Sequence, residues 1–295
     1  MNQWRWWVQA SRPKTLVLSF FPTACGIAWA WHDGVVIPVR AGITLVCAVL
    51  LQVLANYVNE LGDYVRGADT PERLGPPRAV AMGAISPSAM RRASLIVSAV
   101  VLALGLVLVA QVGWWLLAVG LAALLLAWLY TMGARPLAYV GLGELAAVVF
   151  FGLVPSAGAY AIERLALAAE PIISGLAFGA FAAAVLGINN VRDLQLDRQV
   201  GKHTLAVRLG KDAATRLLHL LLAIPYATAL VLSIWYPAAS SALVTLPFAW
   251  TIARDLQHAD GKAYNQLLAR TLLLTTLYGV LLIGAIVLRP LTTTK

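Results

Sequence analysis

The feature that most constrains this chain is the alternation of long apolar runs with short islands of charge. The runs are about 17–25 residues long, the length that an α-helix needs to cross the hydrocarbon core of a bilayer. Charged residues make up 12% of the chain, about half of the share that is usual in a soluble domain. The pattern therefore predicts a polytopic, all-α membrane protein without a separate soluble domain.

Nine transmembrane spans are predicted within one integral-membrane domain that covers residues 1–295. The spans cover residues 15–32, 40–61, 93–112, 114–131, 138–161, 170–191, 213–236, 238–256 and 267–288. The eighth span is the weakest because Pro247 interrupts it. Gly175 and Gly179 stand four residues apart in the sixth span, a spacing that favours close packing of membrane helices.

The basic residues predict how the spans are oriented. With nine spans, 18 of the 22 Lys and Arg residues fall on the side of the N-terminus. Basic loops face the cytoplasm, so we expect the N-terminus inside and the C-terminus outside. Residues 1–15 combine Trp with Arg and Lys, which predicts a segment that lies on the membrane surface. No nucleic-acid partner is indicated, and the oligomeric state is left open.

Two loops on the cytoplasmic side are expected to cap the bundle. They cover residues 62–92 and 193–212, and the first is much longer than a usual connection between helices. Ser86 and Pro87 inside it have the sequence of a helix N-cap followed by a first-turn proline. Both loops adjoin clusters of acidic residues, as the loops at a functional face often do.

The acidic clusters combine amides and carboxylates at helical spacing. The first contains Asn56, Asn59, Glu60 and Asp63, and the second contains Asn189, Asp193 and Asp197. Residues spaced in this way share one face of a helix. Oxygen ligands without Cys or His suit a hard cation. We therefore predict a Mg²⁺ site formed by Asn59, Glu60, Asp63, Asn189, Asp193 and Asp197.

Basic residues close to these acids indicate a ligand that is itself anionic. They are Arg66, Arg78, Arg192, Arg198 and Lys202. A diphosphate fits, because Mg²⁺ bridges carboxylate and phosphate oxygens while Arg and Lys bind the remaining oxygens. A transporter or channel is the competing class. It would place acids at the bilayer midplane in broken helices, whereas these acids gather at one face, which favours an enzyme.

Further polar residues lie near the ends of the fourth and fifth spans. Glu144 lies just inside the fifth span, where an isolated carboxylate is costly. It either serves the site or pairs with Arg135 at the interface. Tyr130 and Tyr139 lie nearby. Tyr130, Arg135, Tyr139 and Glu144 are the candidate contacts for a second substrate.

Several blocks of sequence are similar to those of the UbiA superfamily of intramembrane aromatic prenyltransferases. The blocks are residues 10–16 (ASRPKTL), 59–63 (NELGD), 67–69 (GAD), 73–78 (RLGPPR), 141–144 (GLGE), 150–152 (FFG), 189–198 (NNVRDLQLDR) and 201–210 (GKHTLAVRLG). Within the superfamily the chain resembles the 1,4-dihydroxy-2-naphthoate polyprenyltransferases of menaquinone biosynthesis. It departs from their first motif, Asn-Asp-Tyr-Gly-Asp, at Glu60 and Leu61.

The resemblance implies nine transmembrane helices around a central cavity in a bacterial cytoplasmic membrane. It implies Mg²⁺ and a polyprenyl diphosphate held between the two motifs, with the tail directed toward lipid. Asn59, Asp63, Asp193 and Asp197 match the metal and diphosphate positions, and Asp63, Asp193 and Asp197 are the expected catalytic residues. The expected diphosphate contacts are Arg12, Asn56, Arg78, Arg198 and Lys202.

The resemblance also implies the reaction. A polyprenyl chain moves from its diphosphate to 1,4-dihydroxy-2-naphthoate, CO₂ is lost, and demethylmenaquinol forms. The alternatives keep this chemistry and change the acceptor to 4-hydroxybenzoate, a chlorin or a protohaem. The Gly-Pro-Pro-Arg segment and the block at residues 201–210 favour the naphthoate, by resemblance.

Overall fold

The computed structural model describes residues 2–70 and 73–288 of the chain, and within them there are helices and connecting segments but no β-strand. The predicted all-α class is therefore confirmed. The long helices are α2 (Val17–His32), α3 (Pro38–Val65), α4 (Pro87–Val112), α5 (Trp115–Leu129), α8 (Ala169–Arg192), α11 (Lys211–Trp235), α12 (Leu246–Leu256) and α13 (Ala263–Val287).

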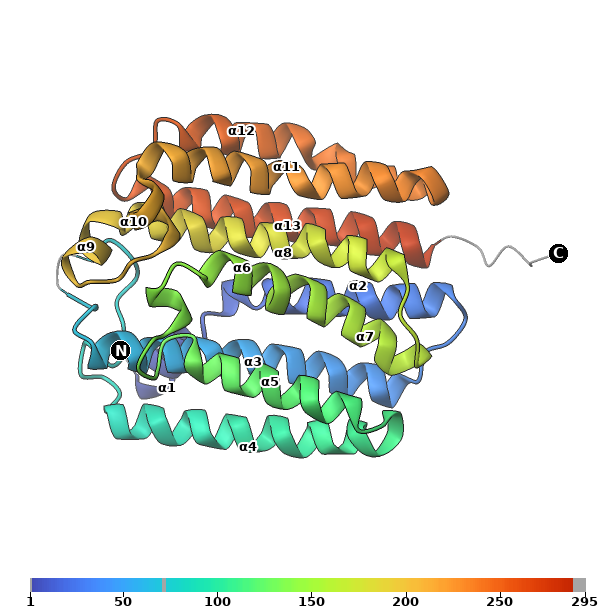
Figure 1. Ribbon diagram of the computed structural model, residues 1–295, viewed down its shortest axis with the longest axis horizontal. Coiled ribbons are helices and arrows are strands. Elements are labelled where there is room, and N and C mark those ends of the chain that lie inside the picture. Colours follow the sequence, from blue (N-terminus) through green and yellow to red (C-terminus); the bar gives the residue numbers. More distant parts are fainter. Residues whose placement is uncertain (1, 71–72, 289–295) are drawn as a thin grey trace.

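These helices lie side by side along the long axis of the molecule (Figure 1). Three short helices gather at one end of the bundle: α1 (Gln3–Ser11), α9 (Leu194–Gln199) and α10 (Leu205–Leu209). The described residues between α3 and α4, 66–70 and 73–86, lie at the same end. We call this end of the bundle the capped end. Both acidic clusters reach it, because α3 and α8 each finish there.

Six helical segments of the described residues are long and apolar enough to cross a membrane. They are α3, α4, the segment Gly143–Arg164, α8, α11 and α13. The protein is thus a multi-pass membrane protein. The remaining predicted spans correspond to α2, α5 and α12, which are shorter than these six segments. The count of nine therefore stays a prediction. The predicted outer C-terminus lies outside the described residues.

The two predicted loops differ in detail from their expected ranges. Helix α3 continues to Val65, and α4 begins at Pro87, so only residues 66–86 connect them instead of 62–92. The N-cap prediction is confirmed, since the Ser86 hydroxyl accepts a hydrogen bond from the Ala89 amide at 3.2 Å. Within residues 193–212 the chain forms two short helices, α9 and α10.

The fifth predicted span, 138–161, is broken rather than continuous. A short 3₁₀ turn, η2 (Leu137–Tyr139), is followed by α6 (Gly143–Val148), a π-helical turn, η3 (Val149–Leu153), and α7 (Val154–Arg164). Gly141 separates η2 from α6 with φ of +75°, a conformation that suits glycine. The eighth span is also irregular: 3₁₀ helix η4 (Pro237–Thr245) precedes α12, whose first turn contains Pro247.

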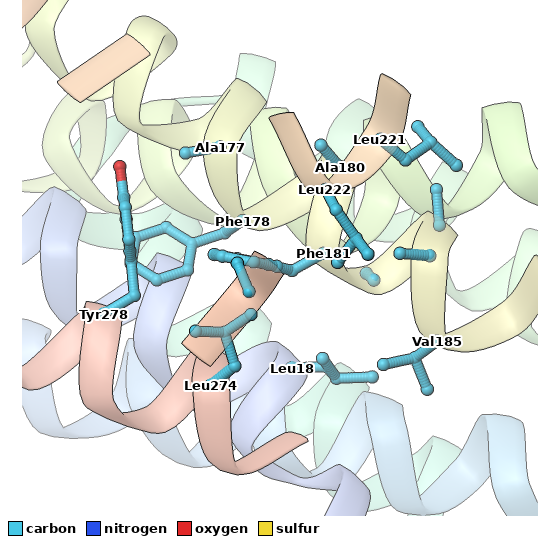
Figure 2. Close-up of a cluster of buried hydrophobic side chains, with 14 of the residues drawn as sticks. Leu18, Ala177, Phe178, Ala180, Phe181, Val185, Leu221, Leu222, Leu274 and Tyr278 are labelled. Carbon is cyan, nitrogen blue, oxygen red and sulfur yellow. The ribbon is translucent and has the colours of Figure 1, made fainter. Parts of the chain in front are cut away.

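Helix α8 forms the centre of the bundle. In its most apolar 18-residue window, 78% of the residues are buried, against 22% for α4 at the edge. Phe178 and Phe181 of α8 pack edge-on against Tyr278 of α13, with ring centroids 5.9 and 5.2 Å away (Figure 2). The Tyr278 hydroxyl donates to the Pro225 carbonyl oxygen in α11 at 2.8 Å. Packing in the core therefore fixes the position of α8, and the second acidic cluster lies at the end of this helix.

Glycines bring α8 into backbone contact with the π-helical turn. A Cβ atom on Gly152 would lie 2.3 Å from the Gly175 carbonyl oxygen, and one on Gly179 would lie 2.5 Å from the Val148 carbonyl oxygen. The predicted packing role of Gly175 and Gly179 is confirmed. This contact places α6, which carries Glu144, against α8.

Candidate functional site

Two cavities adjoin in the bundle. One, of about 320 Å³, is lined mainly by apolar side chains of α2, α3, α4, α5, α7 and α8. The other, of about 90 Å³, lies at the capped end and is lined mainly by charged and amide side chains. They share the lining residues Arg12, Asn59, Tyr130, Gly143, Leu186 and Asn189. One ligand with a charged head and an apolar tail can therefore occupy both.

The first acidic cluster presents Asn59 and Asp63 to the polar cavity. The Asn59 side-chain oxygen accepts hydrogen bonds from Arg12 at 2.7 Å and Arg78 at 3.0 Å. Asp63 accepts from the Tyr139 hydroxyl at 3.2 Å and lies 3.4 Å from Arg78 Nη2 and 3.9 Å from Lys202 Nζ. These cations come from three different segments, so Asn59 and Asp63 form the point at which the segments meet.

Two members of the predicted first cluster face elsewhere. Glu60 is buried outside the lining of the polar cavity, and its carboxylate accepts the Val80 amide at 3.0 Å. Asn56 lines the apolar cavity and donates to the Ser11 carbonyl oxygen at 2.9 Å. Glu60 points away from the side chain of Asn59 because successive residues of an α-helix are about 100° apart around its axis. The geometry thus favours Asn59 and Asp63, but not Glu60, as ligands in the cavity.

The second acidic cluster contributes Asn189, Asp193 and Asp197 to the polar cavity. Both oxygens of Asp193 accept from the Arg192 guanidinium, at 2.8 and 2.6 Å. Asp197 Oδ1 lies 3.8 Å from Lys202 Nζ, and its Oδ2 is buried without a hydrogen-bond partner. Arg198 is exposed and does not line the cavity, so the structure separates it from the predicted diphosphate contacts.

The buried charges of the cavity shift one another's protonation. Burial raises the pKa of Asp197 to about 6, while Lys202 opposes the rise. Burial and the nearby Asp63 likewise raise the pKa of Asp69, an acid of the 66–86 segment, to about 6. For Lys202, burial disfavours the charge, but Asp63 and Asp197 outweigh it and raise the lysine pKa. At neutral pH Asp69 and Asp197 are therefore mostly ionised, and Lys202 is protonated.

The donor set of the cavity fits a hard cation. Asn59, Asp63, Asn189, Asp193 and Asp197 supply amide and carboxylate oxygens, and Asp197 Oδ2 has no other partner. Among residues 2–70 and 73–288, no three His, Cys, Asp or Glu side chains already converge as a metal-binding group. Because Arg78, Arg192 and Lys202 now hold these acids, metal binding requires small rearrangements of side chains.

The candidate contacts for the second substrate divide into two sets. Tyr130 lines both cavities and Glu144 lines the polar one, whereas Arg135 is exposed and lines neither. Glu144 does not pair with Arg135; its Oε1 accepts from Asn190 at 2.8 Å, and its Oε2 is buried without a partner. The ring of Tyr139 lies between two cations, Arg66 at 5.1 Å and Lys202 at 5.3 Å, so it supports the acidic cluster.

Three residues of the site received no role from the sequence. Arg73 lines the polar cavity, and Asn190 holds Glu144. Both lie within sequence blocks that resemble the family, so the sequence could have indicated that they belong to the site. Asn265 on α13 donates to the Leu74 carbonyl oxygen at 2.9 Å and accepts from Arg192 at 2.7 Å. It lies far from either motif, and no sequence pattern marks it.

These features define a class: a multi-pass membrane protein in which a cavity lined by charged and amide side chains adjoins an apolar chamber. The chain belongs to the UbiA prenyltransferase family, whose model matches residues 19–275. It is 40% identical over 218 residues to the 1,4-dihydroxy-2-naphthoate octaprenyltransferase of Escherichia coli (strain K12), covering 71% of this chain and 70% of that protein. The Mycobacterium tuberculosis protein of the same name is 37% identical over 257 residues, covering 86% of this chain and 87% of that protein.

Solved structures of the family share the fold. The apo structure of a UbiA homolog from Aeropyrum pernix K1 superposes with a TM-score of 0.71 at 17% identity, covering 90% of this chain and 97% of that one. A UbiA homolog from Archaeoglobus fulgidus, bound to GPP and Mg²⁺, has a TM-score of 0.69 at 17% identity and covers 95% and 99%. The UbiA-type architecture predicted from the sequence is confirmed.

Proposed function

We propose that this protein transfers a polyprenyl chain from polyprenyl diphosphate to 1,4-dihydroxy-2-naphthoate, with Mg²⁺ as cofactor. The whole chain acts as one catalytic domain. The observation that carries the proposal is the junction of the polar and apolar cavities at Asn59, Tyr130 and Asn189. The names of the relatives from E. coli and M. tuberculosis support the acceptor. The expected location is a bacterial cytoplasmic membrane, with the capped end and N-terminus in the cytoplasm and the C-terminus outside.

The polar cavity binds the diphosphate. Arg12, Arg73, Arg78 and Lys202 line it and provide the charge-assisted hydrogen bonds that phosphate oxygens accept. Asn59, Asp63, Asn189, Asp193 and Asp197 would hold Mg²⁺, which when bound neutralises charge that builds on a departing diphosphate. The cations of the cavity share that role because they are fixed in place before the reaction. Asn56 and Glu60 lie outside the polar cavity and bind the neighbouring backbone at Ser11 and Val80. Arg198 is exposed and has no part in this arrangement.

The reaction balances without a net proton transfer. The allylic C–O bond of the donor breaks, and its electron pair leaves with the diphosphate. The carboxylated ring carbon of the naphthoate uses a ring electron pair to bond the allylic carbon. The C–CO₂ bond then breaks, its electron pair restores the aromatic ring, and CO₂ departs. The protein therefore needs to orient the ring and exclude water, and the apolar lining of the larger cavity does the latter.

Glu144 and Tyr130 orient the acceptor ring in this proposal. The unpartnered Oε2 of Glu144 is a free hydrogen-bond acceptor beside the junction of the cavities, and the acceptor carries hydroxyl groups that donate. A hydroxyl that donates to a carboxylate makes its ring more electron-rich and hence a better nucleophile. Asn190 holds the other oxygen of Glu144 and so fixes its direction. Arg135 and Tyr139 are less suited, since Arg135 is exposed and Tyr139 donates to Asp63.

Glu144→Gln is expected to weaken use of the acceptor selectively. The change keeps the side-chain size but replaces a charged hydrogen-bond acceptor, a loss that corresponds to about tenfold to a hundredfold in kcat/KM for the naphthoate. The KM for polyprenyl diphosphate should stay within about twofold, because Glu144 is not among its contacts. Steady-state kinetics with each substrate varied in turn measures both. Glu170→Gln, which changes a glutamate bonded to Tyr236 on another part of the bundle, is the matched control. An equal rise in both KM values would contradict the assignment.

Removal of Mg²⁺ is expected to abolish the whole reaction. Purified protein in lipid vesicles would receive 1,4-dihydroxy-2-naphthoate and a polyprenyl diphosphate, with Mg²⁺ or with EDTA. Prenylated naphthoquinone and CO₂ should form together and only with Mg²⁺, and added Mg²⁺ should restore the EDTA-treated sample. Prenylation of 4-hydroxybenzoate instead would keep the mechanism and change the acceptor. Folded protein that prenylates no acceptor would refute the proposal and would favour the competing class, a transporter.

A further inference from the structure

Asn265, in the first turn of α13, connects two segments that carry parts of the polar cavity. Its side-chain oxygen accepts from Arg192 Nη1 at 2.7 Å, and its side-chain nitrogen donates to the Leu74 carbonyl oxygen at 2.9 Å. Asn265 itself does not line the cavity. Both ends of its amide are thus used within the protein, and the two partners determine which end is oxygen and which is nitrogen.

On the Arg192 side, Asn265 orients the cation that holds an acid of the site. The Arg192 side chain is 2% exposed and binds both oxygens of Asp193 at 2.8 and 2.6 Å. Asp193 lines the polar cavity, whereas Arg192 lies behind it. Each carboxylate oxygen has two lone pairs, so Asp193 keeps acceptor sites toward the cavity while Arg192 occupies the others. Asn265 therefore helps to set the direction in which Asp193 faces.

On the Leu74 side, Asn265 holds the segment that carries two cations of the cavity. Arg73 precedes Leu74, Arg78 follows it four residues later, and both line the polar cavity. The same segment packs against Arg192, because a Cβ atom on Gly75 would lie 3.0 Å from Arg192 Nη2. One amide thus joins the cations of the segment 73–78 to the acid of the second cluster.

We propose that Asn265 is a positioning residue that sets the separation between Asp193 and the cations Arg73 and Arg78, so that one metal-bound diphosphate contacts both. The inference rests on the proposed function, in that it takes the ligand of the polar cavity to be a diphosphate. Groups that orient metal ligands from behind change metal affinity by about 10–100-fold when they are removed. An effect of that size is expected here, without any contact between Asn265 and the ligand.

Asn265→Leu tests the proposal, since it keeps the approximate volume and removes both hydrogen bonds. Isothermal titration of the full chain in detergent with inorganic pyrophosphate, in the presence of Mg²⁺, should show binding weakened by about tenfold or more. The KM for the naphthoate should change less than about twofold. Trypsin should cleave faster after Arg73 than in the wild type, because the Leu74 carbonyl has lost its donor. Thr276→Val removes a hydroxyl that bonds only within α13 and should leave all three unchanged.

Asn265→Asp provides a second variant of nearly the same size. It keeps an acceptor for Arg192 and loses the donor to Leu74, so faster cleavage after Arg73 is again expected, with weaker pyrophosphate binding. Wild-type affinity for Mg²⁺-pyrophosphate in both variants would overturn the proposal, and so would an equal loss of affinity in Thr276→Val. If the wild type prenylates no naphthoate while Asn265→Leu still loses pyrophosphate affinity, the proposed acceptor fails and the positioning role of Asn265 stands.

Discussion

Asp63→Ala and Asp193→Ala are each expected to abolish prenyl transfer while leaving a folded membrane protein. Asp63 meets Arg78, Tyr139 and Lys202, so its removal leaves cations without their acid and deprives the diphosphate site of a metal ligand. Activity should fall by about a thousandfold or more, the upper range for removing one charge-stabilising group from an active site. Turnover of both variants in lipid vesicles, with melting temperatures by circular dichroism, measures the two effects.

The exposed Asp212, in the first turn of α11, offers a control. Asp212→Ala should retain wild-type activity, because it removes an acid of the same chemistry away from the polar cavity. Asp63→Asn keeps the shape of the side chain and separates loss of charge from loss of packing. Full activity in a folded Asp63→Ala or Asp193→Ala protein would refute the assignment of the metal site.

Gly179→Val is expected to prevent α8 from packing against the π-helical turn, and so to destabilise the whole protein. A Cβ atom at Gly179 would lie 2.5 Å from the Val148 carbonyl oxygen and 2.9 Å from the Val148 Cα atom. Backbone atoms cannot move aside as a flexible side chain does, so we expect a loss of about 3 kcal/mol or more in the free energy of unfolding. Thermal unfolding of the purified protein in detergent measures it.

The matched control is Gly284→Ala on α13, where nothing lies within 4 Å of the added Cβ atom. A helical glycine replaced by alanine at such a site should gain about 0.5–1 kcal/mol. A Gly179→Val protein with the melting temperature of the wild type would show that the two backbones are not in contact. Gly179→Val should lower the yield of folded protein, whereas Asp63→Ala should lower turnover alone.

The long membrane helices were largely predictable from the length of the apolar runs in the sequence. Long apolar runs have few alternatives in a membrane, and α3, α4, α8, α11 and α13 lie close to their predicted ranges. The fifth span was predicted as continuous because most of its residues apart from Glu144 are apolar or small. Its π-helical turn lies where Gly152 contacts the backbone of α8. Its break at residues 140–142 lies beside the Tyr139 carbonyl oxygen, which accepts a hydrogen bond from the His203 amide at 3.1 Å, and such tertiary contacts leave no local pattern.

The site was predictable where helical spacing controls it and not where tertiary packing does. Helical spacing predicts a shared face within each cluster, and Asn59, Asp63, Asn189 and Asp193 all line the polar cavity. Spacing alone did not show whether Asn59 or Glu60 faces the cavity, because either one can share a helix face with Asp63. The segment 66–86 decides between them, since its Val80 amide binds Glu60. Asn265 was not predictable, because its role depends on two contacts with residues distant in the chain.

The junction of the two cavities has a consequence for how the products of the proposed reaction separate. Before the reaction, one molecule spans both compartments; afterwards its anionic half and its isoprenoid half are no longer joined. The pyrophosphate is left among cations at the aqueous end, and the quinol is already anchored by its tail in an apolar compartment. Several residues of α4 and α5 that line this compartment, such as Leu102, Leu106 and Leu121, are also exposed at the surface of the protein. In the proposed reaction the pyrophosphate would thus leave from the aqueous end, and the quinol would enter the bilayer from the apolar compartment without passing through water.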